Sequence, residues 1–294
     1  MNPIIYLNGR YLSENEAVIS VNDRGFMFAD GTYDVLRGVN GKLFHGKEHF
    51  NRLNYCLKEL RIEFSDTEQL LPVIDELILA NDLMNSEYSV YLQITRGVFK
   101  RTHIFPTEFV NPTVFISVKK FNPYIIEFNE GVKCITVEDI RWHRCDIKTI
   151  ALLANVLAVQ QAYEQNAYEA IFIRNGMITE ASHSNVFGVI GDVIFTHPRN
   201  NQILSGISRE ILIELCKSNG YKIIEEAIPA SRIDELSELM VVGTSTEVMP
   251  VVQLNNKIIG NGKPGKIQQN LQKIFTDYMK NYFQDTTEPD LKIR

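Results

Sequence analysis

The residue with the clearest chemical potential is a lysine that stands among apolar neighbours. Before Lys148, the segment 132–137 alternates like a β-strand, and after it apolar residues recur at helical spacing over 152–163. Lys148 is therefore predicted at a strand-to-helix junction, with Arg141 and Arg144 a few residues before it. Because burial and nearby cations both disfavour an ammonium ion, a lysine in such a place can attack a carbonyl carbon and form a Schiff base. The alternative is an ordinary lysine in contact with solvent.

Three basic residues have surroundings that suit anion binding. Arg52 lies beside the apolar stripe of a helix predicted over 48–62, where it can bind a phosphate with two parallel hydrogen bonds or extend to water. Arg101 and His103 lie in the connection 96–111, which is far longer than a hairpin needs. Long ordered connections in compact domains are usually functional, so this pair is a candidate carboxylate site. A solvated basic loop is the alternative.

Two further segments have both a functional and a structural interpretation. The segment 23–34 is polar, contains glycines and carries aromatic residues, which favours either the rim of a pocket or an ordinary loop with Phe26 and Phe28 in the core. Ser205 and Ser208 stand where a helix begins, so they predict a phosphate cradle at free backbone N–H groups or plain N-caps.

The glycine-rich stretch 260–266 matches the spacing of a phosphate-binding P-loop up to its lysine. The next residue is Ile267, where the motif needs Ser or Thr to hold magnesium. A hairpin-like Asn255-Asn256 turn precedes it, and not the first strand of a parallel sheet. We therefore reject a nucleotide site in this stretch.

Turn residues place these candidates in a frame of mixed secondary structure. Asn-Gly pairs and a Gly-Asp pair predict four hairpins, at 8–9, 40–41, 175–176 and 191–192. So many hairpins favour antiparallel or mixed sheets, and the chain has no Rossmann fingerprint, which predicts the α+β class. The remaining periodic segments predict strands at 88–95, 113–118 and 239–242, and helices at 67–81, 204–217 and 265–283.

A polar stretch with a proline, 119–124, is the best candidate for a domain boundary. The predicted organisation is an N-terminal domain over 1–120, a linker over 121–125 and a C-terminal domain over 126–283. The tail 284–294 has little apolar content and is predicted to fray.

The composition excludes several classes of function. A chain of 294 residues, 45% hydrophobic and 22% charged, can bury a sizeable core. A net charge of −6 argues against nucleic acid or an anionic membrane as the main partner, and no run approaches the ~20 apolar residues of a membrane helix. Four scattered cysteines without a CxxC pair argue against a metal site and a disulfide framework and fit a reducing cytoplasm. Cys145, near Lys148, is either reactive or a buried structural thiol.

The segment from Val137 to Ile150 closely resembles the lysine segment of the fold-type IV transaminases that use pyridoxal 5′-phosphate (PLP). Among these it is most similar to the bacterial D-amino acid transaminases, over nearly the whole chain. The resemblance implies the two-domain fold of that family, with Lys148 as the residue that forms a Schiff base with PLP and Glu180 as the partner of the pyridine nitrogen. A carboxylate there keeps the nitrogen protonated, so that the ring accepts the electrons left on the substrate Cα. The Lys148 amine, once released, can move the Cα proton.

The same resemblance implies roles for the other candidate residues. The phosphate is expected to be bound by Arg52, Ile207, Ser208 and Thr244, and the back of the pyridine ring to contact Leu204. The substrate α-carboxylate is expected to be bound by Tyr33, Arg101 and His103. In this family the Arg-x-His loop comes from the neighbouring subunit, so a homodimer is implied.

Two positions depart from the family pattern. His183 stands near the active site where a serine is usual, and Gly243 replaces another serine in the turn by the phosphate. The first is expected to affect proton handling or substrate fit, and the second cofactor binding. Neither changes the pair formed by Lys148 and Glu180.

The resemblance thus implies a cytoplasmic, homodimeric aminotransferase with PLP as cofactor. It is expected to move the amino group between D-amino acids, such as D-alanine or D-glutamate, and 2-oxo acids, such as 2-oxoglutarate, in a ping-pong sequence. Two alternatives share the fold: a branched-chain L-amino acid transaminase, which lacks the Arg-x-His pair, and aminodeoxychorismate lyase, which would use Lys148 to eliminate pyruvate. A regulatory nucleotide-binding protein would depend on the stretch 260–266.

Overall fold

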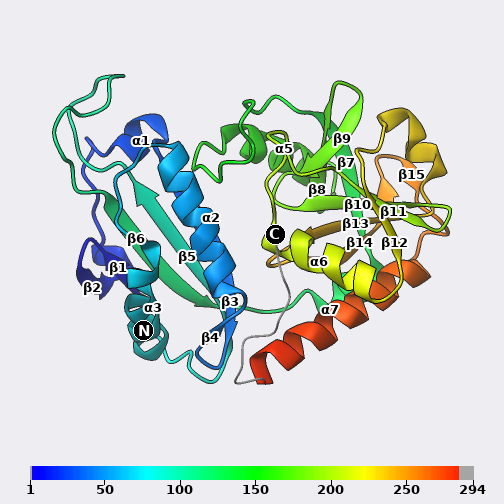
Figure 1. Ribbon diagram of the computed structural model, residues 1–294, viewed down its shortest axis with the longest axis horizontal. Helices are drawn as coiled ribbons and strands as arrows, with labels where there is room; N and C mark the ends of the chain where they lie inside the picture. The colour runs from blue at the N-terminus through cyan, green and yellow to red at the C-terminus, as the bar shows by residue number, and fades with distance from the viewer. Residues whose placement is uncertain (1, 285–294) are drawn as a thin grey trace. The chain divides into compact units, whose positions relative to one another are not determined.

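The computed structural model describes residues 2–284, and these form two compact units (Figure 1). The first unit comprises the described residues up to Asn122 together with Ile147–Leu152. The second comprises Pro123–Asp146 and the described residues from Leu153 onward. The short segment around Lys148, which the sequence places in a C-terminal domain over 126–283, therefore packs with the first unit. The predicted tail lies, after Gln284, outside the described residues.

The first unit is built on an antiparallel sheet of six strands in the order β2-β1-β6-β5-β3-β4. Its hairpin turns at Asn8-Gly9 and Asn40-Gly41 confirm two of the predicted hairpins, and each of these four residues has a positive φ. The strands are Ile4–Leu7 (β1), Arg10–Ser13 (β2), Gly31–Val39 (β3), Lys42–Leu43 (β4), Glu87–Thr95 (β5) and Thr113–Lys120 (β6).

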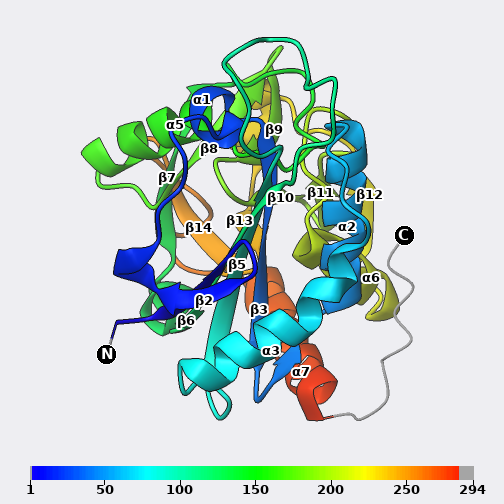
Figure 2. The same cartoon turned by 90° about the vertical axis from the view of Figure 1, so that its left-hand side faces the viewer.

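Helices cover one face of this sheet, as Figures 1 and 2 show for α2 and α3. The core on that face joins Phe50, Leu53 and Leu57 of α2 to alternate residues of the strands, such as Leu36 and Leu92. The predicted helix 67–81 is divided into a 3₁₀ turn and an α-helix, because Pro72 fits best at a helix start. The elements are Glu14–Glu16 (η1), Arg24–Phe28 (α1), Gly46–Glu59 (α2), Thr67–Leu70 (η2) and Leu71–Ala80 (α3).

The second unit is built on a mixed sheet of nine strands, in which β7 is parallel to both β8 and β14. The α+β class with antiparallel and mixed sheets is thus confirmed. The strands are Val132–Glu138 (β7), Glu169–Arg174 (β8), Met177–Ala181 (β9), Asn185–Ile190 (β10), Val193–Thr196 (β11), Lys222–Glu225 (β12), Glu238–Gly243 (β13), Glu247–Leu254 (β14) and Lys257–Ile258 (β15).

Helices contact the strands of this sheet, and α6 and α7 also contact each other. The sequence analysis missed β12, the long partner strand β14 and the short helix α4, which begins inside the stretch predicted as a linker. The helices are Ile125–Glu130 (α4), Leu153–Glu164 (α5), Ile207–Ser218 (α6), Ala230–Glu235 (η3, 3₁₀) and Lys266–Gln284 (α7).

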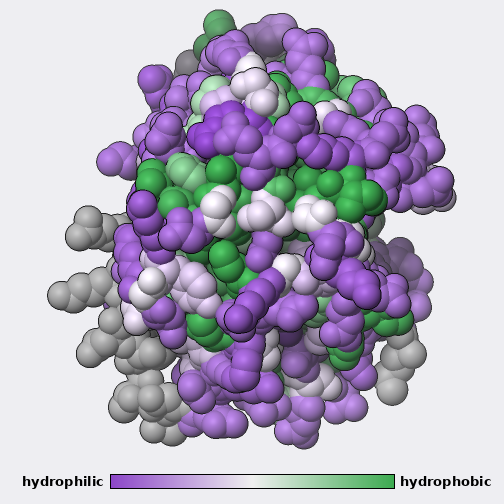
Figure 3. Space-filling view, turned by 90° about the vertical axis from the view of Figure 1, so that its right-hand side faces the viewer, coloured by the Kyte–Doolittle hydropathy of each residue, from purple (hydrophilic) through white to green (hydrophobic). Residues whose placement is uncertain are grey.

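The surface view in Figure 3 shows hydrophilic side chains over most of one face, with a band of hydrophobic ones among them. Within residues 2–284, none of the helices combines the length and the apolar content needed to span a lipid bilayer.

Candidate active site

Lys148 lies along the edge of β3, held there by its backbone. Its carbonyl oxygen accepts hydrogen bonds from the Tyr33 amide, at 3.1 Å, and from the Thr32 hydroxyl, at 2.7 Å. Its amide donates to the Cys56 sulfur at 3.2 Å. Three contacts from a strand and a helix fix the backbone of this residue, which is what a lysine with a precise chemical role requires.

The Lys148 side chain points to Tyr33. Its Nζ lies 3.4 Å from the Tyr33 hydroxyl and 4.4 Å from the ring centroid. The Tyr33 ring stacks on Tyr91, with centroids 5.7 Å apart and 26° between the planes. The structure thus brings together two residues that the sequence predicted for one site.

Arg52, the predicted phosphate ligand, forms a bidentate pair with a buried aspartate on β3. Its Nε and Nη2 donate to the two carboxylate oxygens of Asp34 at 2.9 and 2.7 Å, and His49 Nδ1 lies 2.8 Å from the same carboxylate. Burial alone would raise the pKa of Asp34, but Arg52 and His49 outweigh it and lower that pKa well below its usual range. Burial lowers the pKa of His49, which keeps its ring neutral near pH 7. Asp34 therefore sets the direction of the Arg52 guanidinium.

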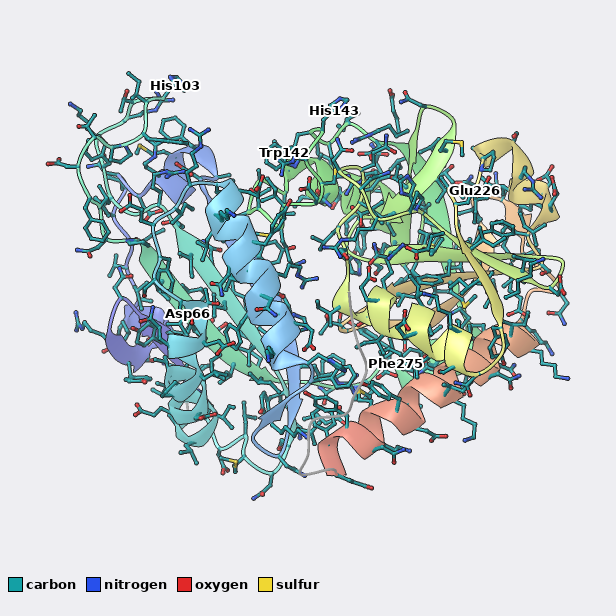
Figure 4. All side chains as sticks on the ribbon, viewed as in Figure 1. Asp66, His103, Trp142, His143, Glu226 and Phe275 are labelled. Carbon is teal, nitrogen blue, oxygen red and sulfur yellow. The ribbon has the colours of Figure 1, made fainter. Side chains whose placement is uncertain are left out.

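Arg101 and His103 are exposed in the long loop after β5, and Figure 4 shows His103 in that loop. Both rest on Phe28, with the Arg101 guanidinium carbon 5.2 Å and the His103 ring 5.5 Å from its ring centroid. The loop is anchored by Arg24, whose Nη1 donates to the Thr102 carbonyl at 2.7 Å. The alternative that Phe26 fills the core is wrong, because this side chain is 69% exposed.

Glu180 is a buried carboxylate of β9 in the second unit, with a donor on each oxygen. Arg141 Nη1 donates to Oε1 at 2.5 Å, while Asn185 Nδ2 and the Leu204 amide donate to Oε2 at 3.1 and 3.0 Å. Burial raises the pKa of Glu180, and Arg141 opposes that effect by stabilising the anion. Of the two arginines that precede Lys148 in sequence, Arg141 binds Glu180 and Arg144 pairs with Asp146.

The second unit has backbone N–H groups at the start of α6 and a turn that carries a threonine. Ile207 and Ser208 are buried in its first turn, and its N-cap, Gly206, supplies no side-chain cap. The Ser205 hydroxyl donates to Glu210 at 2.8 Å. Thr244 lies in the turn that joins β13 to β14. Uncapped N–H groups at a helix start, together with hydroxyl groups, are the donors that bind phosphate.

Gly206 is required because the chain passes very close to Asn185. A Cβ at this position would lie 2.2 Å from Asn185 Oδ1. Asn185 Nδ2 donates both to Glu180 and to the Leu204 carbonyl, at 2.9 Å. One amide therefore ties the buried carboxylate to the segment that leads into α6.

The two departures from the family pattern lie in adjoining turns. His183 has its amide 2.7 Å and its Nδ1 3.1 Å from Oε1 of Glu169, a fully buried carboxylate of β8. Ser184 Oγ, next in the chain, lies 3.5 Å from Thr246 Oγ1. A Cβ at Gly243 would lie 2.8 Å from the same Thr246 oxygen, so a serine there would displace Thr246.

The sequence analysis missed the positioning roles of four residues. For the three that lie in strands, a polar residue at an inward position of an otherwise apolar strand was the available signal, since such a residue needs a specific partner. The partners lie far along the chain and are visible only in the fold. These residues are Asp34, Arg141, Glu169 and Asn185.

The family model for Amino-transferase class IV matches residues 31–254. The chain belongs to the class IV aminotransferase family. It is similar over 94% of its length to the D-alanine aminotransferase of Staphylococcus haemolyticus, of which it covers 98% at 38% identity. The D-alanine aminotransferase of Bacillus licheniformis is 37% identical over 91% of this class IV aminotransferase, which covers 94% of that protein.

Solved structures show the same fold for this class IV aminotransferase. The branched-chain amino acid aminotransferase of Escherichia coli superposes with a TM-score of 0.88, 97% of each chain covered and 22% identity. The T.th. branched-chain amino acid aminotransferase, solved with pyridoxamine 5′-phosphate, gives a TM-score of 0.85 at 23% identity. The superposition covers 96% of this chain and 95% of that enzyme. The predicted fold type IV is confirmed.

Class IV aminotransferases are PLP-dependent, and this chain is a PLP-dependent aminotransferase. The residues of the second unit fit that cofactor. Glu180, buried with an arginine behind it, suits a cationic ring N–H group, and the α6 start with Thr244 suits a phosphate. Cofactor and family, both expected from the resemblance, are confirmed.

Proposed function

We propose that this aminotransferase moves the amino group between D-amino acids and 2-oxo acids in a ping-pong sequence. The observation that carries the proposal is the likeness to enzymes named D-alanine aminotransferase over nearly the full length of both chains. The structural neighbours that are branched-chain enzymes share the fold at lower identity and do not decide the substrate.

We assign the reacting groups as follows. Bound PLP supplies an electron sink for the bond that breaks at the substrate Cα. Lys148 would hold the cofactor covalently and, as a neutral amine, would move the proton at the substrate Cα. The Tyr33 hydroxyl orients that amine, since the two groups lie 3.4 Å apart. Glu180 holds the proton on the ring nitrogen.

The phosphate and ring contacts follow from the donors at the α6 start. Ile207 and Ser208 bind phosphate oxygens with their amides, Thr244 adds its hydroxyl, and Arg52 adds a charged pair of donors oriented by Asp34. Leu204, whose amide binds Glu180, contacts the back of the ring.

The substrate is bound through its carboxylate by Tyr33 and by an arginine and a histidine of the neighbouring subunit, Arg101 and His103. We therefore propose a homodimer with a shared site, in which His183 contributes to substrate fit. The exposed apolar face of α5 supports a subunit interface, because Leu153 and Tyr163 are 73% and 74% exposed. Four buried free thiols support a reducing compartment, the cytoplasm.

A visible spectrum of the PLP-loaded protein tests the substrate class. D-alanine should bleach the band of the bound cofactor, and L-leucine should leave it unchanged. Bleaching by L-leucine alone would replace the proposal with a branched-chain L-amino acid transaminase. Pyruvate release from aminodeoxychorismate without amino transfer would replace it with the lyase.

A further inference from the structure

Arg141 connects two buried carboxylates of the second unit. Its Nε and Nη2 donate to the two oxygens of Asp139, each at 2.9 Å, and its backbone amide donates to Asp139 Oδ1 at 3.1 Å. Its remaining terminal nitrogen, Nη1, donates to Glu180 Oε1 at 2.5 Å. All three side chains are at least nine-tenths buried, with 8% of Arg141 exposed. All three nitrogens of the guanidinium therefore donate to the two acids, and Nη2 also donates to the Gln202 carbonyl at 3.4 Å.

Neighbouring strands hold this arginine in one orientation. The Asp139 amide donates to the carbonyl of Ile173 in β8 at 2.9 Å, which fixes the segment after β7. The Phe172 ring lies 4.2 Å from the guanidinium carbon, and Arg174 Nη2 lies 3.0 Å from Asp139 Oδ1. The side chain therefore has one well-defined direction, toward Glu180. Figure 4 shows the next two residues, Trp142 and His143, in the segment after β7.

The charges around Glu180 explain why such an arginine is needed. Burial raises the pKa of this carboxyl group, and the Asp139 carboxylate raises it further. Arg141 is the cation that hydrogen-bonds to Glu180, while Arg174 pairs with Asp139. The Cys145 thiol is close enough to interact electrostatically with Glu180. Without Arg141, two acids would face each other in a buried site, and one of them would take up a proton.

We propose that Arg141 is a positioning residue of the cofactor site, which keeps Glu180 ionised and aimed so that it can hold the proton on the PLP ring nitrogen. This inference depends on the role of Glu180 in the proposed function. The competing account is that Arg141 only stabilises the fold, by linking the segment after β7 to strand β9. The two accounts differ in what happens to the ionisation of Glu180.

The first test titrates Glu180 in the cofactor-free protein by the infrared band of a protonated carboxyl group. The band is assigned to Glu180 because it should disappear when the Glu180→Gln substitution is introduced into the same protein. In Arg141→Met the titration midpoint of Glu180 should rise by at least one pH unit. In Arg141→Lys, which keeps a positive charge, the midpoint should lie between those of the wild type and Arg141→Met. Arg144→Met is the matched control, since Arg144 lies three residues after Arg141 and pairs with Asp146, and its midpoint should equal that of the wild type.

The second test measures PLP affinity of the same proteins. Arg141→Met should weaken PLP binding at least tenfold at pH 8, and Arg144→Met should not. A folded Arg141→Met protein with an unchanged infrared midpoint and an unchanged PLP affinity would overturn the proposal and leave Arg141 with a structural role only. If Arg141→Met does not fold, Arg141→Gln, which keeps a hydrogen-bond donor but loses the charge, must raise the midpoint by a smaller amount, and no shift would overturn the proposal.

These outcomes also separate this inference from the proposed function. If Glu180→Gln leaves PLP affinity and the visible spectrum unchanged, the role of Glu180 in cofactor binding is wrong. The infrared titration would then still report whether Arg141 controls the charge of Glu180.

Discussion

At the scale of single residues, two of the predicted site residues are oriented by a second residue that is buried and charged. Asp34 orients Arg52, and Arg141 holds Glu180. A buried ion pair contributes little net stability, but removal of one partner leaves an uncompensated charge. The loss in free energy of unfolding when one partner is substituted therefore tests whether the two residues are paired.

Lys148→Ala should remove the covalent link to the cofactor. After borohydride reduction and digestion, the wild-type peptide that contains Lys148 should carry the mass of the reduced cofactor, and the variant should carry none. Lys133→Ala is the control, since Lys133 donates to the Gln165 carbonyl from an exposed position. A reduced adduct on another lysine of the variant would refute the assignment.

Asp34→Asn should lower the free energy of unfolding at pH 7 by about 3–5 kcal/mol, because Arg52 is left buried without its counter-ion. The folded-state pKa of Asp34 is lowered, so its contribution is complete above the ordinary aspartate pKa of about 4 and is lost as the pH falls further. Denaturant titrations should therefore show a steeper acid loss for the wild type than for Asp34→Asn. Glu214→Gln, in a largely exposed pair with Lys217, should cost at most about 1 kcal/mol. Equal costs for both variants would contradict the pairing argument.

At the scale of elements, local patterns predicted the strands and helices well because hairpin turns and apolar spacing are local. Asn8-Gly9 and Asn175-Gly176 lie at turns between paired strands, and α6 begins within three residues of its predicted start. Lys148 was placed correctly between β7 and α5, but its docking on β3 joins residues more than a hundred positions apart. No local pattern encodes such a contact, and the same holds for Arg141 with Glu180.

Gly206→Ala tests whether the start of α6 needs this close approach. The new methyl group would meet Asn185 Oδ1, so we expect a loss of about 1–3 kcal/mol in stability and weaker PLP binding. Gly46→Ala, in the first turn of α2, brings its Cβ no closer than 3.2 Å to the side chain of Leu43 and serves as the control. Urea unfolding and PLP titration of both proteins make the comparison. Unchanged PLP affinity in Gly206→Ala would show that the cofactor does not depend on this turn.

At the scale of the whole molecule, α5 has an unusual distribution of side chains. Its buried residues are the small Ala158 and Ala162, while Leu153, Val156 and Leu157 are exposed. The periodic apolar residues that predicted this helix therefore do not fill the core of the described chain. A contiguous exposed apolar face of this kind is typical of a protein interface, and a dimer would bury it.

Val156→Glu should weaken the proposed dimer, because it places a charge in that apolar face. Sedimentation at micromolar concentration should show monomers with reduced transaminase activity. Ile258→Glu, at an exposed apolar residue of β15, is the matched control and should remain dimeric. A fully active monomer of either variant would contradict the shared site.

Mixed subunits test the shared site directly. Arg101→Ala should raise KM for D-alanine far more than it weakens PLP binding, and Lys148→Ala should be inactive. In a heterodimer of the two, a shared site combines the intact Lys148 of one chain with the intact Arg101 of the other, while the second site lacks both residues. Random mixing of equal amounts makes half of the dimers mixed, each with one intact site, so about a quarter of the wild-type activity at low D-alanine should return. If Arg101 serves the site of its own chain, each mixed dimer has no complete site, and the mixture should show only the residual activity of the separate variants.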